Sequence, residues 1–361
     1  MKVAIRADAS VQIGSGHVMR CLTLADDLRE RGAEVRFITR AHPGGAQALI
    51  AKRGYACHLL PAPQPGGSVM GDLAHSAWLG VPWEDDLARS AAVLADWSPQ
   101  WLVVDHYGLD WRWEQPLRGQ VPRILAIDDL ADRRHDCDLL LDQNYYSDLD
   151  QRYAALVPPH CTCLLGPGYA LLRPEFTVAG QALHRGTGPV RRVLLFMGGM
   201  DQDNATSIAL RGLQDFAKAG IAIDVVLGAG APHRDQVRTL CESTPNTRLH
   251  VQVDNMAELM ASADLAIGAC GSATWERCFL GLPTIAIVLA DNQRRSAHDL
   301  AAAGYIVNLG EVAQVTPEKV AQAVAALTAD DAGRVAMSRR ALGLARREPR
   351  TVADLIYEGT R

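Results

Sequence analysis

The sequence lacks any run of about eighteen apolar residues, the length that a membrane-spanning helix requires. It also lacks the apolar core of a signal peptide, because Met1 and Lys2 lead directly into a strand-like pattern. A basic excess is missing too, since 36 Lys and Arg residues stand against 41 Asp and Glu residues, a net charge of -5. We therefore expect a cytoplasmic protein that binds neither nucleic acid nor membrane.

Metal-binding patterns are equally scarce. Of the eight cysteines, only Cys161 and Cys163 are close in sequence, and no second pair or histidine cluster accompanies them at ligand spacing. We expect reduced packing cysteines, no metal and no cofactor. The length of 361 residues, 48% of them hydrophobic, exceeds what one core usually fills, so two globular domains are expected.

The most informative stretch lies near the start of the chain. Val3-Ala4-Ile5 reads as a buried strand, Gly14 and Gly16 break it, and a helical pattern begins at about His17. The carboxyl end of a parallel strand is where open α/β folds bind ligands. The two glycines leave no Cβ between backbone and ligand. An imidazole at this junction is placed to take a proton from water.

Simpler readings of this stretch exist. The loop lacks the third glycine of the dinucleotide fingerprint, so we do not expect NAD. A histidine in a first helical turn is often only a cap or a surface residue. The spacing alone leaves His17 open between these roles and catalysis.

Further polar residues follow later strand patterns. Trp101-Leu-Val-Val-Asp105 precedes Tyr107, and Leu139-Leu-Leu-Asp142 precedes Asn144. Strands in a parallel sheet end at the same edge, so we expect Tyr107 and Asn144 on the rim that holds His17. Asp128 and Asp129 follow another such strand. Each aspartate could instead be a turn residue, and Tyr107 a core aromatic.

The second half repeats the arrangement. A strand at 193–197 stops at Gly198-Gly199, with the next helix expected around Asn204, and a strand at 264–268 leads to Gly271-Ser272. A helix N-terminus at Gly271 could hold a diphosphate without net basic charge. Glu276, one turn further on, could accept the ribose hydroxyl protons. The alternative is a plain cap, with Ser272 as the N-cap and Glu276 solvated.

These observations predict an α/β protein with two Rossmann-like domains facing a cleft. We place the N-terminal domain at 1–176, a linker at 177–189 and the nucleotide-binding domain at 190–361. The last helix is a candidate to cross back onto the first domain.

Several strings resemble a known family. The N-terminal string with Arg6, Asp8 and His17 resembles the signature of the nucleotide-sugar hydrolases of pseudaminic acid biosynthesis, relatives of the GT-B glycosyltransferases. Similar strings are Asp105-His-Tyr-Gly108, Gly166 to Phe176, and Gly281-Leu-Pro283 followed by Asn292-Gln293. The resemblance implies cleavage of UDP-2,4-diacetamido-2,4,6-trideoxy-β-L-altropyranose.

The resemblance also implies roles for residues. His17 would be the general base for a water that attacks the anomeric carbon with inversion. UDP would bind the second domain, with uracil against the backbone near Met256 and Gln293 near the phosphate or sugar. The predicted substrate-binding residues, each at a position named above, are Arg6, Asp8, Gly14, Gly16, Tyr107, Asn144, Gly198, Gly199, Met256, Gly271, Ser272, Glu276 and Gln293.

Other functions share part of this pattern. A UDP-sugar glycosyltransferase would have the same C-terminal motif but a sugar or lipid acceptor in place of water. A UDP-sugar epimerase is a further alternative. A non-catalytic sensor of UDP-sugar would keep Glu276 and have no need of His17.

Overall fold

The computed structural model describes residues 1–64, 71–181, 183 and 185–360. The chain divides into two compact units. Unit 1 comprises Met1–Asn144, Asp148–Leu171 and the chain from Arg347 on, and unit 2 comprises Tyr145–Ser147 and Leu172–Arg346. Within the described ranges, no helix combines the length and the apolar character needed to span a bilayer.

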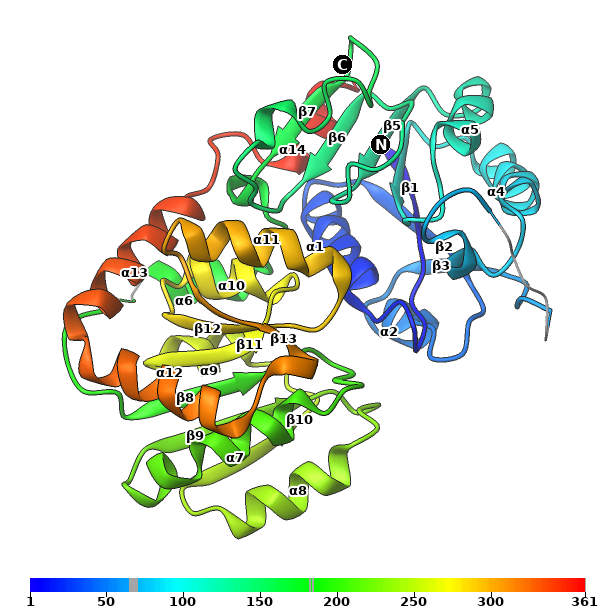
Figure 1. Ribbon diagram of the computed structural model, residues 1–361. Helices are drawn as coiled ribbons and strands as arrows, with labels where there is room; N and C mark the ends of the chain where they lie inside the picture. The colour runs from blue at the N-terminus through cyan, green and yellow to red at the C-terminus, as the bar shows by residue number, and fades with distance from the viewer. Residues whose placement is uncertain (65–70, 182, 184, 361) are drawn as a thin grey trace. The chain divides into compact units, whose positions relative to one another are not determined.

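Unit 1 is built on a parallel sheet. Among the described residues it has seven strands in the order β3-β2-β1-β4-β5-β6-β7, flanked by helices (Figure 1). Its strands are β1 (Lys2–Ala7), β2 (Glu34–Arg40), β3 (Ala56–Leu60), β4 (Trp101–Asp105), β5 (Arg123–Ile127), β6 (Leu139–Asp142) and β7 (Thr162–Leu165). Its helices are α1 (Gly16–Glu30), α2 (Gln47–Lys52), α3 (Ser76–Leu79), α4 (Trp83–Trp97), α5 (Trp111–Glu114) and α14 (Val352–Glu358), with 3-10 turns η1 (Gln115–Gly119), η2 (Leu149–Gln151) and η3 (Pro167–Tyr169).

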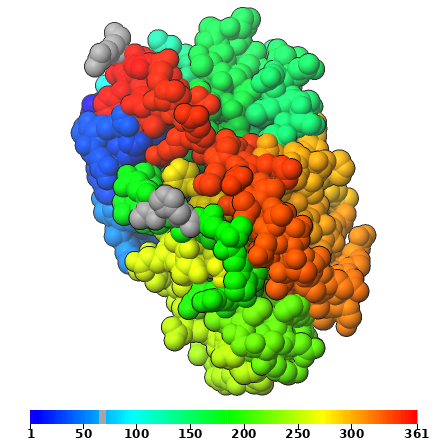
Figure 2. All heavy atoms as spheres, turned by 90° about the vertical axis from the view of Figure 1, so that its left-hand side faces the viewer, coloured from blue at the N-terminus to red at the C-terminus, as the bar shows by residue number. Residues whose placement is uncertain are grey.

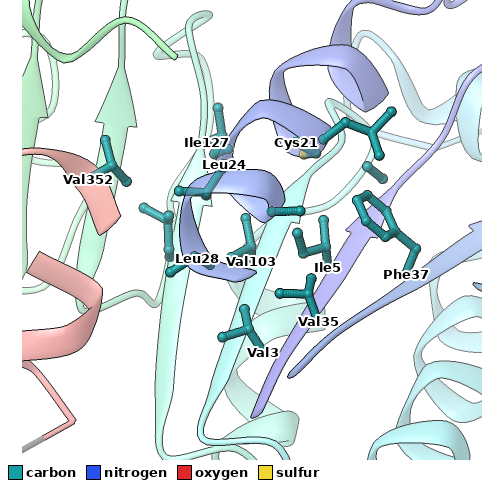
Figure 3. Packing of buried hydrophobic residues seen from close by; sticks show 14 of the residues in the cluster. Val3, Ile5, Cys21, Leu24, Leu28, Val35, Phe37, Val103, Ile127 and Val352 are labelled. Atoms are coloured by element: carbon teal, nitrogen blue, oxygen red, sulfur yellow. The ribbon is translucent and has the colours of Figure 1, made fainter. Parts of the chain in front are cut away.

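The core of unit 1 explains why α1 holds its first turn firmly. Leu24 and Leu28 point from α1 onto the sheet residues Val3 and Val103, all fully or almost fully buried (Figure 3). Burial of each such side chain contributes about 1.5–3 kcal/mol to stability. This exceeds the stability lost through the weak helix propensity of the β-branched residues in α1. The other sheet face packs separately against α4 and α5.

The end of the chain belongs to unit 1. Val352 of α14 lies beside Leu24 and Leu28 in Figure 3, and Figure 2 shows the red C-terminal segment against the blue N-terminal segment. The Tyr357 hydroxyl donates to the carbonyl oxygen of Arg31 over 2.8 Å. A helix distant in sequence therefore completes the first core.

Unit 2 is a second parallel sheet, with six strands among the described residues in the order β10-β9-β8-β11-β12-β13. Its strands are β8 (Arg192–Phe196), β9 (Ala222–Leu227), β10 (Thr247–Val251), β11 (Leu265–Ala269), β12 (Thr284–Val288) and β13 (Val307–Glu311). Its helices are α6 (Pro174–Gln181), α7 (Ala205–Lys218), α8 (Arg234–Ser243), α9 (Met256–Ser262), α10 (Ala273–Phe279), α11 (Asp291–Ala302), α12 (Pro317–Ala329) and α13 (Asp331–Leu344), with the 3-10 turn η4 (Val312–Gln314).

The boundary between the units differs from the predicted one. Unit 2 begins at Leu172, and α6 packs against α9 and α10, so the start of the predicted linker 177–189 is helical and part of unit 2. Residues 182 and 184 of that linker lie outside the described residues. Phe176 explains the difference, because this fully buried ring joins a core cluster with Leu194 and Met260.

Candidate functional site

His17 stands at the predicted strand–loop–helix junction. Gly14 closes a tight turn with φ +77°, a conformation that favours glycine, and its N–H donates to the carbonyl oxygen of Ser10. A Cβ added at Gly14 or Gly16 would meet nothing within 4 Å, so the space above this loop is open. The α1 N-cap is Ser15, without a side-chain cap bond, so His17 is not the capping residue.

A buried carboxylate fixes the His17 ring. Asp105, the last residue of β4, lies with Oδ1 2.5 Å from His17 Nδ1. The neighbouring strands β1 and β4 bring this pair together, because each ends at the same edge of the sheet. Arg20, one turn beyond His17, donates from Nε and Nη2 to both Asp105 oxygens over 2.6 and 2.7 Å.

The charge of Asp105 sets the tautomer of His17. Burial alone would raise the pKa of Asp105, but the positive charge of Arg20 and the His17 contact hold it well below its usual value. An ionised carboxylate only accepts hydrogen bonds, so in the neutral imidazole His17 Nδ1 carries the proton and Nε2 is an acceptor. Arg20 Nη2 also lies 3.3 Å from Nδ1, but its shorter bond is to Asp105. The sequence places Asp105 at the end of a predicted strand, on the same rim as His17, but it did not assign Asp105 a role in the site.

Aromatic rings surround the imidazole. Tyr107 meets His17 edge-on with ring centroids 4.6 Å apart, and Trp78 stacks on Tyr107 at 5.5 Å. The Tyr107 hydroxyl donates to Asp129, and burial together with that carboxylate raises the pKa of Tyr107 well above its usual value. Tyr107 therefore lies beside His17, as expected, but with its hydroxyl engaged inside the protein.

Arg6 and Asp8, predicted to bind substrate, make their polar contacts within the protein. Both are fully buried, and Arg6 donates to Asp8 over 2.6 Å and to Asp86 over 2.7 Å. Asp8 also accepts from the Arg40 N–H over 2.7 Å. Because this ion cluster satisfies the charges within the protein, it ties β1, β2 and α4 together. Direct contact with a substrate would require both side chains to leave it.

Asn144 sits half-buried just past β6, and its N–H donates to Asp142 Oδ1 over 2.9 Å. Asp142 is almost fully buried, and its Oδ2 lies 3.0 Å from the Tyr153 hydroxyl. Burial and the nearby charges of Asp129 and Asp128 raise the pKa of Asp142 to about 8. The charge of Arg152, whose Nε lies 3.4 Å from Asp142 Oδ2, opposes this shift only in part.

Unit 2 carries a second set of predicted residues at the carboxyl end of β11. Gly271 is half-buried, and a Cβ added there would meet only the Gln293 amide nitrogen, 3.9 Å away. Ser272 is exposed and makes no side-chain cap bond, so the simple capping alternative does not describe it. Glu276 is not freely solvated either, because Arg173 Nη2 donates to its Oε1 over 3.1 Å. Arg173, within a string that resembles the family, was not predicted as a site residue.

A buried guanidinium lies beneath this loop. Arg277 is 2% exposed, and no carboxylate of the described residues forms an ion pair with it at the distances seen elsewhere in the chain. Its Nη2 donates to the Ala269 carbonyl oxygen over 2.6 Å and to the Thr274 hydroxyl over 3.1 Å. Burial lowers the pKa of Arg277. Gly268 makes room for it, because a Cβ there would lie 2.7 Å from Arg277 Nη1.

The remaining predicted residues of unit 2 follow other strand ends. Gly198 comes just after β8 with φ +95°, and a Cβ added there would meet nothing within 4 Å, while the Gly199 carbonyl oxygen accepts the Gly228 N–H over 3.1 Å. Met256 begins α9, with its side chain in the core. Gln293 Oε1 accepts the Leu289 N–H over 3.1 Å. Across the described parts of both units, no group of three His, Cys, Asp or Glu side chains could hold a metal ion.

Comparison with solved structures identifies the architecture. Acinetobacter baumannii MurG matches with a TM-score of 0.65 at 16% identity, over 99% of each chain. The spinosyn rhamnosyltransferase SpnG, solved with thymidine diphosphate, matches with a TM-score of 0.64 at 19% identity, over 100% of each chain. This protein has a GT-B fold. In this GT-B protein, residues 193–354 match the model of the glycosyltransferase family 28 C-terminal domain.

Relatives in sequence cover most of the GT-B chain. It is 27% identical to the UDP-2,4-diacetamido-2,4,6-trideoxy-beta-L-altropyranose hydrolase of Campylobacter jejuni over 85% of this chain and 98% of that one. It is 25% identical to an uncharacterized protein of Methanocaldococcus jannaschii over 83% of this chain, and spans 58% of that longer protein. A spore coat polysaccharide biosynthesis protein of Bacillus subtilis is 23% identical over 88% of this chain and 86% of its own length. The similarity to the nucleotide-sugar hydrolase covers nearly all of that protein and 85% of this chain.

Proposed function

We propose that this protein is a GT-B enzyme that acts on a nucleotide sugar. More specifically, we propose that it hydrolyses UDP-2,4-diacetamido-2,4,6-trideoxy-β-L-altropyranose to the free sugar and UDP. The observation that carries the proposal is the His17–Asp105 pair at the carboxyl edge of the first sheet. The similarity to the Campylobacter jejuni hydrolase supports the choice of substrate.

In this proposal His17 is the general base. Because Asp105 holds the proton on Nδ1, Nε2 can take a proton from a water molecule as its oxygen attacks the anomeric carbon. The bond between that carbon and the phosphate oxygen breaks, and UDP leaves with the electron pair. A single displacement inverts the anomeric centre. A pyrophosphate leaves readily, so the step needs no strong general acid.

Unit 2 supplies the proposed UDP site. Gly271, Ser272, Gly198 and Gly199 would present backbone N–H groups to the diphosphate, as glycine-rich loops after strands do. Glu276 would accept the ribose hydroxyl protons, uracil would lie against the backbone at the start of α9, near Met256, and Gln293 would reach the phosphate or sugar. The buried charge of Arg277 favours an anion above this loop, because a low-dielectric surrounding screens it weakly.

Unit 1 supplies the proposed sugar side. The open loop at Gly14 and Gly16 leaves room for the substrate beside His17. Tyr107 and Asn144 follow β4 and β6, which end at the same edge of the unit 1 sheet. We assign Arg6 and Asp8 to the support of β1, β2 and α4, because both are fully buried in the ion cluster that joins these elements.

Product analysis tests the proposal. The purified protein, given the altrose substrate without any acceptor, is expected to release UDP and free sugar in equal amounts, and His17→Ala is expected to lower turnover about a hundredfold to ten-thousandfold while UDP binding is kept. Turnover only after addition of a sugar or lipid acceptor would instead identify a glycosyltransferase, the activity that the family 28 match would favour. Near wild-type turnover by His17→Ala would refute the base assignment.

A further inference from the structure

The short helix α3 places Trp78 beside His17, and its N-cap residue His75 lies next to Trp78. Leu79 of this helix is 1% exposed and belongs to the core on the α4 side of the sheet. Trp78, the residue before it, is only half-buried and stacks on Tyr107 at an interplanar angle of 28°. Leu79 therefore anchors α3, and this keeps Trp78 against Tyr107 at the sheet edge that carries His17.

The aromatic rings form one continuous group around the general base. Trp78 lies 6.3 Å from the His17 ring, edge-on, and His75 lies 4.6 Å from Trp78 and 5.3 Å from Tyr107. Tyr107 is the centre of the group and is 3% exposed, whereas His75 and Trp78 are half-buried and form its open part. The buried Nδ1 of His75 has no hydrogen-bond partner among the described residues.

Two features of this arrangement cost stability. A buried polar atom without a partner costs about 1–3 kcal/mol, and a half-exposed indole forgoes much of the gain that core burial would bring. Trp78 contacts the ring of the residue proposed to activate water, and His75 contacts Trp78. Aromatic side chains with a few polar atoms are the usual lining of small-molecule sites.

We propose that Trp78 and His75 form a carbohydrate platform that receives the C–H face and the methyl groups of the substrate's sugar, with Trp78 as a specificity-determining residue. This inference rests on the nucleotide-sugar function proposed above. The deoxy and acetamido groups of the sugar offer methyl groups that suit an indole face better than hydroxyls do. The affinity for UDP alone, which lacks the sugar, should not depend on Trp78.

Calorimetry on full-length variants tests the platform. In a His17→Ala background, in which we expect the substrate to be preserved, Trp78→Ala is expected to raise the Kd of the intact UDP-sugar about tenfold to a hundredfold and to leave the Kd of UDP unchanged. Trp78→Phe, which keeps a ring, should restore most of the affinity. Trp78→Leu keeps apolar volume without an aromatic face and should behave like Trp78→Ala, which covers the case in which the alanine variant fails to fold.

Trp111 offers a matched control. It is 36% exposed on α5 and its ring contacts Arg134, so Trp111→Ala should change neither Kd. An unchanged Kd for the UDP-sugar in both Trp78→Ala and Trp78→Leu would overturn the platform, and so would an equal loss for UDP alone. Failure of the wild type to release UDP would refute the hydrolase, whereas the binding comparison would still decide the platform.

Discussion

Asp105→Asn is the sharpest perturbation of the proposed chemistry, because it changes charge without changing shape. Arg20 donates to both oxygens of Asp105, so an amide nitrogen at either position faces a guanidinium donor. Placed on the His17 side, that nitrogen donates to Nδ1 and moves the imidazole proton to Nε2, which then cannot act as a base. Placed on the other side, it breaks the shortest Arg20 contact.

The magnitude follows from these contacts. Loss of a positioned base lowers kcat about a hundredfold to ten-thousandfold, or about 3–5 kcal/mol in the activation barrier. Leaving one partner of a buried ion pair unmatched costs about 3–5 kcal/mol of unfolding free energy, and the ion pair that Arg20 keeps is its 3.2 Å contact with Asp129. A coupled assay for released UDP gives kcat, and urea unfolding gives stability.

Asp128→Asn separates chemistry from stability. Asp128 is also fully buried at the end of a neighbouring strand and pairs with Arg133 over 2.8 Å, but it does not contact His17. The Asp128→Asn variant should lose about as much stability as Asp105→Asn, with kcat nearly unchanged. An Asp105→Asn enzyme with kcat within about threefold of wild type, or an equal fall of kcat in both variants, would refute the tautomer argument.

Two further predictions concern Glu276 in unit 2 and Asp142 in unit 1. Glu276→Ala should weaken UDP binding at least about tenfold by calorimetry, as the loss of a charged hydrogen-bonding group implies. Glu175→Ala, which removes the other carboxylate paired with Arg173, should leave UDP affinity unchanged. Equal UDP affinities in the two variants would move the ribose site elsewhere. Asp142→Asn should stabilise the protein at pH 8 by about 2–5 kcal/mol and much less at pH 4. The reason is that the raised pKa, about 8 against about 3.9 in an unfolded chain, makes this group's contribution fall as pH rises between those values; equal effects at both pH values would contradict it.

Local pattern was enough to predict the elements that carry the site. Apolar runs bounded by glycine or aspartate predicted β1, β4, β6 and β11, and the helix expected at about His17 begins at Gly16. The reason is physical: a buried parallel strand must be apolar throughout, and the turn after it must supply glycine or a polar residue. Because the predicted sheets are parallel, their strands were expected to end at one edge.

Only tertiary structure decided which partners these residues have. His17 and Asp105 are far apart in the chain and meet because β4 pairs with β1, which no local spacing encodes. The fully buried state of Arg6 depends on Asp86 from α4, and the pKa of Asp142 depends on charges from another strand end. The chain's local pattern therefore determined where chemistry-bearing side chains emerge, because period and turn geometry are short-range properties. Their burial, protonation and neighbours are long-range properties that strand order and core packing set.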